Sequence, residues 1–183
     1  MDVEPNGTAN RILEAALRTL ARQGADNFSM ASIGREAHVS RRTLYRYFHN
    51  RDEVLEAVAV HIGNSYARAI DEAIAANPDI DRRIEVILSA TVNYGDFHPA
   101  ALAVMQMEPG FTFQFLQSTL PDYIEVARKG IEPVAQQVPA LRSGSVTVEQ
   151  VAEVVIRLGI SGFSFPSKGA EDLGEVLTRL IRG

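Results

Sequence analysis

The chain has 183 residues, of which 46% are hydrophobic and 22% charged; its formal net charge is −5 and it contains no cysteine. This composition is that of an ordinary globular protein with one or two domains. It excludes extended disorder, disulfide bonds and cysteine-ligated metal centres.

The charge is unevenly distributed along the chain. Residues 1–51 hold eight arginines and five acidic residues, a net charge of +3, whereas residues 52–183 hold ten basic and eighteen acidic residues, a net charge of −8. A basic head on an acidic body predicts that only the N-terminal part meets a polyanion such as DNA. The first residues lack the pattern of a signal peptide and no apolar run reaches the roughly 20 residues that span a bilayer, so we expect a cytoplasmic protein without membrane contact.

Helical periodicity runs along the chain, and no two neighbouring segments of alternating polarity are joined by a hairpin turn, which predicts an all-α fold of about nine helices. An apolar stripe predicts a first helix at about 9–23. N-cap serines predict two short helices, at about 30–37 after Ser29 and at about 41–47 after Ser40.

Capping patterns and proline positions predict the later elements. Asn50 and Glu53 form a capping-box-like start to a long helix that ends near Ala76. Further helices are expected at about 84–92, 100–108, 119–137, from Thr147 onward and at about 173–181. Non-helical segments are expected at 111–115 (an aromatic connector), 139–145 (a loop) and 164–169 (a turn).

The two short helices, joined by three or four residues and flanked by helices on both sides, form a helix-turn-helix arrangement. On a wheel at about 100° per residue, one side of the second short helix is apolar, with Leu44, Tyr47 and Phe48, and we expect these rings to pack in the core. The other side carries three arginines and a phenol: Arg41, Arg42, Tyr45 and Arg46. Taken alone, such a face is typical of ordinary solvated surface, but in this setting it can offer guanidinium groups to guanine edges and phosphates.

Fixed spacings link several of these helices. They are Ile12-Leu13-x-x-Ala16, Gly24, Phe28-Ser29-Met30-x-x-Ile33, Val39-Ser40, Thr43-Leu44-Tyr45-x-Tyr47-Phe48 and Asn50-Arg51-x-x-Val54-Leu55. With them, the stretch from Arg11 to Ile62 resembles the DNA-binding region of the TetR family of bacterial transcriptional regulators. Two residues depart from the family pattern: His38 stands where the turn usually has glycine, and Gly34 replaces an alanine.

The resemblance implies a DNA-binding domain at residues 1–51 and an all-helical ligand-binding and dimerisation domain at 52–183. It implies that Ser29, Tyr45 and Arg51 anchor phosphates and that exposed residues of the second short helix read bases. The DNA-binding candidates are Ser29, Ser40, Arg41, Arg42, Thr43, Tyr45, Arg46 and Arg51. The expected partners are a double-stranded DNA operator with pseudo-palindromic half-sites, a second copy of the chain and a small effector that releases the DNA, so that repression is expected.

Aromatic and methionine residues of the central helices are either packed core or the lining of an effector pocket. The candidates are Tyr94, Phe97, Met105, Met107, Phe111, Phe115, Tyr123 and Phe163. Few polar residues accompany them, which favours an apolar or amphipathic effector. Those available to orient it are Asp96, His98, Gln106 and Glu108.

The last two helices each carry an apolar stripe, and Gly159 and Gly162 permit a close helix approach. These stripes either close the core of the single chain or, as the resemblance implies, form a dimer interface. The four histidines do not have the spacing of a metal site, and no cofactor is expected. Two rival functions remain: an all-α binding module without DNA affinity, and a small helical enzyme whose turnover would depend on Asp96 or His98, although no enzyme activity is expected.

Overall fold

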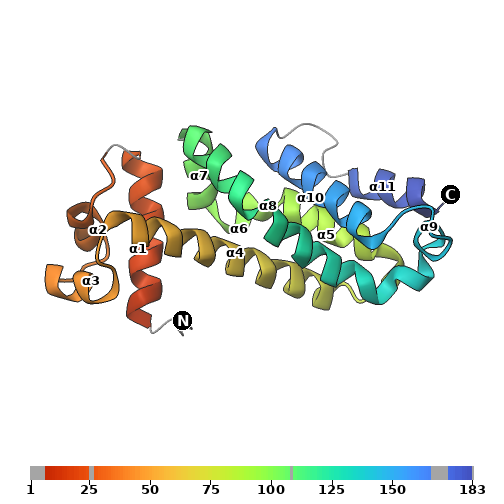
Figure 1. The fold of residues 1–183 in the computed structure, drawn as a ribbon, viewed down its shortest axis with the longest axis horizontal. Coiled ribbons are helices and arrows are strands. Elements are labelled where there is room, and N and C mark those ends of the chain that lie inside the picture. Colours follow the sequence, from red (N-terminus) through yellow and green to blue (C-terminus); the bar gives the residue numbers. More distant parts are fainter. Residues whose placement is uncertain (1–6, 25–26, 108, 166–172, 183) are drawn as a thin grey trace. The chain divides into compact units, whose positions relative to one another are not determined.

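The computed structural model describes residues 7–24, 27–107, 109–165 and 173–182, and this part of the chain forms helices and no β-strand (Figure 1). The first four helices are α1 (Gly7–Gln23), α2 (Met30–Glu36), α3 (Arg41–Tyr47) and α4 (Arg51–Ala76). The later helices are α5 (Arg83–Val92), α6 (Tyr94–Phe97), α7 (Pro99–Met107), α8 (Pro109–Ile131), α9 (Pro139–Arg142), α10 (Val148–Ser164) and α11 (Leu173–Arg182). Two 3₁₀ helices, η1 (Ile80–Arg82) and η2 (Glu132–Gln137), precede α5 and α9. The all-α prediction is confirmed, and nine of these α-helices, all except the four-residue α6 and α9, have seven residues or more.

Capping boxes fix the starts of two helices where the sequence predicts them. At α2, the Ser29 hydroxyl accepts a hydrogen bond from the Ser32 backbone N–H at 3.2 Å, and the Ser32 hydroxyl accepts one from the Ser29 backbone N–H at 2.9 Å. Thr147 and Gln150 form the same reciprocal pair at α10. Each box pairs backbone N–H groups that the helix itself leaves without acceptors.

One compact unit contains the chain up to Ile62 together with His98–Ser118. Its core is built on the apolar face of α1, against which α2, α3, the start of α4 and α7 pack. Fully buried core residues include Ile12, Ile33, Leu44 and Val54. This unit therefore includes α7 as well as the N-terminal helices. The functional division of the chain at residue 51 stays a prediction.

The second unit contains Gly63–Phe97 and the chain from Thr119. Its central helix is α5, which packs against both α10 and α11 (Figure 1). Gly159 and Gly162 of α10 face α5: a Cβ at Gly159 would lie 2.4 Å from Thr91 Cγ2, and one at Gly162 would lie 2.9 Å from Val92 Cγ2. The close approach that the two glycines predict is therefore used within one chain.

Three predictions for the middle of the chain are wrong. Residues 111–115 are not a connector, because they lie within α8, which begins at Pro109. The helix predicted at 119–137 ends earlier than expected, because α8 stops at Ile131 and the 3₁₀ helix η2 follows. Proline lacks a backbone N–H and has a fixed φ, so it is favoured at the first position of a helix, and Pro109-Gly110 opens α8 where a break was expected. For the same reason the expected loop at 139–145 contains α9, which begins at Pro139. Most of the predicted turn at 164–169 lies outside the described residues.

Candidate nucleic-acid interface

The turn between α2 and α3 has the backbone geometry that a helix-turn-helix needs. His38 has a positive φ of 53°, and the Val39 N–H donates to the Gly34 carbonyl at 3.0 Å. Histidine tolerates this region better than most residues with a Cβ, so the turn forms without the glycine that was expected there. The chain thereby reverses within a few residues, and Leu44 of α3 becomes fully buried, with Cδ2 within 3.5 Å of where a Cβ on Gly34 would lie.

Hydroxyl groups hold the start of α3. The Ser40 hydroxyl accepts a hydrogen bond from the Thr43 backbone N–H at 3.1 Å, and the hydroxyls of Ser40 and Thr43 lie 2.9 Å apart. Ser40 is exposed and Thr43 is half-buried. Of these two predicted contact residues, Ser40 therefore also caps the helix. Its exposed hydroxyl keeps the capacity for one further hydrogen bond.

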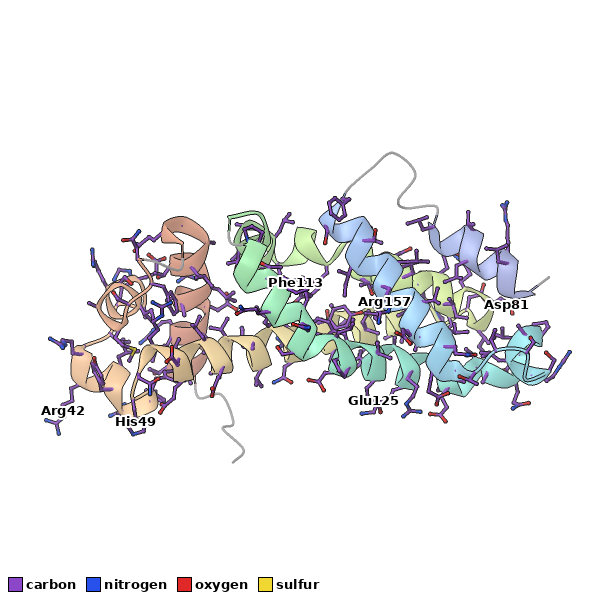
Figure 2. All side chains as sticks on the ribbon, turned by 45° about the horizontal axis from the view of Figure 1, so that its top comes forward. Arg42, His49, Asp81, Phe113, Glu125 and Arg157 are labelled. Carbon is purple, nitrogen blue, oxygen red and sulfur yellow. The ribbon has the colours of Figure 1, made fainter. Side chains whose placement is uncertain are left out.

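The outward side of α3 is cationic. Arg41, Arg42 and Arg46 are exposed, and Tyr45 has 42% of its surface exposed. Within the described part of the chain, none of these arginines forms an ion pair with an acidic side chain. Figure 2 shows Arg42 projecting from α3 away from the ribbon. The opposite side of α3 packs inward as predicted, with Tyr47 and Phe48 half-buried against the core of the first unit.

Aromatic rings flank the cations of this surface. The Arg41 guanidinium lies 6.0 Å from the centre of the Tyr45 ring, and that of Arg46 lies 5.2 Å from the centre of Tyr47. At the start of α4, the exposed Arg51 lies over the buried Phe28 ring at 5.8 Å. Contacts of this kind limit the rotamers of the arginines without neutralising their charge.

The nearest acidic residue of α2 is turned toward α1. Glu36 accepts a hydrogen bond from Arg18 Nε at 2.9 Å, and Arg22 Nη1 lies 3.4 Å from the same carboxylate. The Arg18 hydrogen bond, with the charges of Arg22 and Arg18, lowers the pKa of Glu36 below its usual value. This carboxylate is therefore ionised at neutral pH and occupied by arginines of α1.

The first unit also contains a contact that the sequence pattern did not single out. His61 Nε2 of α4 lies 2.8 Å from Glu14 Oε1 of α1, and the His61 side chain is only 15% exposed. The two residues are 47 positions apart, so neither periodicity nor a motif indicates their proximity. The pair ties the beginning of α4 to the helix that supports α2 and α3.

In the second unit, two of the predicted effector residues lie together around a third tyrosine. The Tyr66 ring lies 5.4 Å from Tyr94 and 4.7 Å from Tyr123, measured between ring centres. The Tyr66 hydroxyl is hydrogen-bonded to Thr91 Oγ1 at 2.7 Å, and all four side chains are buried. Burial is the main cause that raises the pKa of Tyr66 and of Tyr123, so both phenols are neutral at physiological pH.

Of the other predicted effector residues, Phe115 is the one with a described side chain. Phe115 is half-buried and belongs to the first unit. The remaining candidates have side chains outside the described ones: Phe97, Met105, Met107, Phe111 and Phe163. Sequence reasoning missed Tyr66 and Thr91, since both sit in ordinary helical patterns and only the packing of α4 on α5 brings them together.

The described residues include no cluster of three or more histidine or acidic side chains arranged to hold a metal ion. None of the described helices is both long enough and apolar enough to cross a bilayer.

The two short helices, their turn and the exposed arginines of α3 form a helix-turn-helix, a motif of DNA-binding proteins. Residues 12–58 match the model of the bacterial regulatory proteins of the tetR family. This part of the chain is therefore similar to the DNA-binding region of TetR-family transcriptional regulators.

Relatives and solved structures agree with this assignment. An uncharacterized HTH-type transcriptional regulator of Haemophilus influenzae is 34% identical over 64 residues, 35% of this chain and 34% of that protein. An HTH-type transcriptional repressor of Streptomyces coelicolor is 28% identical over 141 residues, 77% of this chain and 66% of that protein. The fatty acid degradation regulator FadR from Bacillus halodurans has the same fold, with a TM-score of 0.68 at 15% identity over 98% of this chain and 97% of that one. Matches to the first curated relatives span 34% to 46% of their length.

Proposed function

We propose that the protein is a dimeric repressor that binds a pseudo-palindromic operator through α3 and is released from it by a small apolar or amphipathic effector. The observation that carries the DNA-binding part is the outward side of α3, where three exposed arginines have no acidic partner among the described residues. Unpaired guanidinium groups are available for guanine edges and phosphates at no cost of breaking an ion pair. The proposal assigns the protein no catalytic role and locates it in the cytoplasm, with the DNA.

The place of each residue in the helices determines which DNA contact we propose for it. Arg41, Arg42 and Arg46 on the outward side of α3 are proposed to enter the major groove and contact base edges, with Tyr45 on a phosphate. Arg51 begins α4, outside the recognition helix, so it is proposed to contact a phosphate. Ser29, Ser40 and Thr43 lie at the starts of α2 and α3, where hydroxyls cap the helices and can also donate to phosphate oxygens.

Two copies are proposed to associate through α10 and α11. Val154 on α10 is 43% exposed, and Val176 and Leu180 on α11 are 49% and 75% exposed. The glycine side of α10 is occupied by α5 of the same chain, which leaves the side with Val154 for a partner. A dimer also explains how a recognition helix of seven residues achieves specificity, because two copies read two half-sites.

Effector control is proposed to act through α4. Residues 51–62 of this helix belong to the first unit and residues 63–76 to the second, so a ligand that shifts α4 in the second unit also changes the orientation of α3. One relative is named a nicotine-responsive transcriptional repressor, from Paenarthrobacter nicotinovorans, with 27% identity over 70 residues. That name supports control by a small organic molecule. The tyrosine cluster with Tyr94 and Tyr123 is the region that we propose contacts the effector.

Selection of bound fragments from a random DNA pool tests the proposal, because it yields the half-sites and their spacing together. With the selected operator, Arg42→Ala is expected to weaken binding by about 1–3 kcal/mol and to relax the preference at one base pair of each half-site. Arg51→Ala is expected to weaken binding to all DNA sequences alike. It should also make the fall of log K with log salt shallower by an amount equal to about one phosphate contact per subunit. An affinity that does not change with salt would favour the rival function of an all-α binding module.

Effector release is tested separately by thermal unfolding with hydrophobic acyl and aromatic compounds. A true effector raises the melting temperature progressively as its concentration increases, and it lowers operator affinity at concentrations that occupy the site. If no compound of either class shifts the melting temperature, the proposed effector class is wrong, while DNA binding is unaffected.

A further inference from the structure

We propose that His49 is an additional phosphate-binding residue, oriented by Glu53, and that it couples DNA binding to the uptake of a proton. This inference rests on the proposed DNA binding. His49 lies in the connection between α3 and α4, outside the recognition helix. Figure 2 shows it at the same end of the first unit as Arg42.

One carboxylate oxygen contacts both the backbone N–H and the imidazole of His49. Glu53 Oε2 accepts from the His49 backbone N–H at 2.7 Å and lies 3.0 Å from His49 Nδ1. Asn50 completes the arrangement, because its side-chain oxygen accepts from the Glu53 backbone N–H at 2.9 Å. The ring is thereby held against α4 by the edge that carries Nδ1, although 80% of the side chain is exposed.

This arrangement determines what the free edge of the ring presents to solvent. A carboxylate accepts only, so Nδ1 carries the hydrogen and the neutral ring exposes Nε2 as an acceptor. An exposed acceptor repels a phosphate oxygen. Once the ring takes up a second proton, Nε2 becomes a cationic donor that suits a phosphate.

Cations outnumber acidic residues in the sequence around His49. From His38 to Glu53 the chain holds four arginines and two acidic residues, Asp52 and Glu53. Glu53 is the charged group in contact with the ring within the described structure, and Arg46 and Arg51 are the nearest cations along the chain. Hydrogen bonds from His49 lower the pKa of Glu53, so the carboxylate stays ionised in mild acid and continues to hold the ring.

The test measures binding to a fluorescein-labelled duplex of arbitrary sequence, about two half-sites long, at about pH 8 and about pH 5.5. An arbitrary duplex suffices because a phosphate contact does not depend on sequence. We expect the wild type to bind about fivefold more tightly at the lower pH, with a salt slope steeper by about 0.9 per subunit. His49→Gln is expected to match the wild type at the higher pH and to lose both differences.

Two further variants separate a DNA contact from a structural role. His38→Asn removes the other imidazole of the helix-turn-helix while keeping a residue that tolerates positive φ, and it should retain the full pH effect. Glu53→Ala removes the acceptor that holds the ring, so the difference in affinity between the two pH values should shrink. An unchanged difference would overturn the role of Glu53.

The outcomes distinguish this inference from the proposed function. If the wild type binds the duplex equally at both pH values, or if His49→Gln keeps the pH effect, the inference is wrong and DNA binding stands. If the wild type binds the duplex at neither pH, the proposed function fails and the inference fails with it.

Discussion

Two residues of the helix-turn-helix, His38 and Gly34, depart from the residues that the backbone geometry there favours. His38 adopts the left-handed conformation that glycine usually supplies, with φ at 53°. Gly34 lies in the interior of α2, where a glycine raises the conformational entropy of the unfolded chain without being needed for the fold. Both departures from the family pattern therefore lower stability, and neither removes a side chain from the DNA-facing surface.

Replacing Gly34 with alanine is expected to stabilise the protein by about 1 kcal/mol, the difference between glycine and alanine in a helix interior. The added Cβ would lie 3.5 Å from Leu44 Cδ2 and 3.6 Å from the Val39 carbonyl oxygen, which are ordinary van der Waals distances. Urea unfolding measures the change. Gly24→Ala is the matched control: Gly24 has φ at 71°, so that substitution should destabilise. A loss of stability in Gly34→Ala would mean that α2 and α3 pack more tightly than described.

At the scale of elements, Arg18 and Glu36 join α1 to α2, and this link predicts a response to acid. The hydrogen bond from Arg18 lowers the pKa of Glu36 from the ordinary 4.5. A depressed pKa means that the stabilisation is present above the unfolded-state pKa and is lost as the pH falls through the lower folded-state pKa. We expect Glu36→Gln to be less stable than the wild type at pH 7 and equal to it in strong acid. Urea unfolding across that range tests this, with Glu56→Gln on the exposed side of α4 as a control that should track the wild type.

The contact between α5 and α10 depends on the absence of a side chain at Gly159. A Cβ there would lie 2.4 Å from Thr91 Cγ2 and 2.6 Å from Thr91 Cβ. Thr91 cannot rotate away cheaply, since its hydroxyl is hydrogen-bonded to Tyr66 at 2.7 Å and to the Ile87 carbonyl at 2.8 Å. Gly159→Ala is therefore expected to destabilise by about 1–3 kcal/mol in thermal or urea unfolding.

Gly63→Ala provides the comparison for that experiment. Gly63 lies inside α4, and the nearest atom to its added Cβ is Tyr123 Cε1 at 4.0 Å, so alanine should be neutral or stabilise by up to about 1 kcal/mol. Equal losses in both variants would show that helix packing is not the cause.

The elements that could be predicted from the sequence are those whose ends are encoded locally. The side chains of Ser29, Ser40 and Thr147 each accept a hydrogen bond from the backbone N–H three residues later. These residues therefore indicate where the helices begin. Pro109 was misread because proline both ends one helix and begins the next, and local sequence does not say which.

The same distinction holds for the sites. The arginine side of α3 follows from angular spacing within one helix, so it could be predicted. The tyrosine cluster brings together residues of α4, α6 and α8, with Thr91 of α5, and periodicity does not predict this packing. Similarly, Gly159 predicts a close approach without naming the partner helix, which proves to be α5 of the same chain.

At the scale of the whole molecule, the uneven charge distribution affects how the protein approaches DNA. The first 51 residues carry a net +3 and the rest a net −8. A basic end attracts DNA at long range, whereas the acidic remainder is repelled, so the protein is oriented before α3 makes its first contact. In a two-fold dimer this orientation acts on both copies at once, and the affinity then depends on how firmly the copies are held together.

The proposed dimer is tested by placing a charge on its apolar surface. Leu180 is 75% exposed in the single chain, so Leu180→Lys loses little packing within one subunit, but in a dimer the ammonium group would be buried against a second apolar surface, at a cost of several kcal/mol. Sedimentation equilibrium should show at least about a tenfold weaker dimer, with thermal stability of the isolated subunit unchanged. Operator affinity should fall steeply, since each monomer then binds one half-site alone. Val60→Lys on α4, 63% exposed in the first unit, is the matched control and should leave the dimer intact. If Val60→Lys separates the subunits and Leu180→Lys does not, the copies meet through α4, and the assignment of α11 to the interface is wrong.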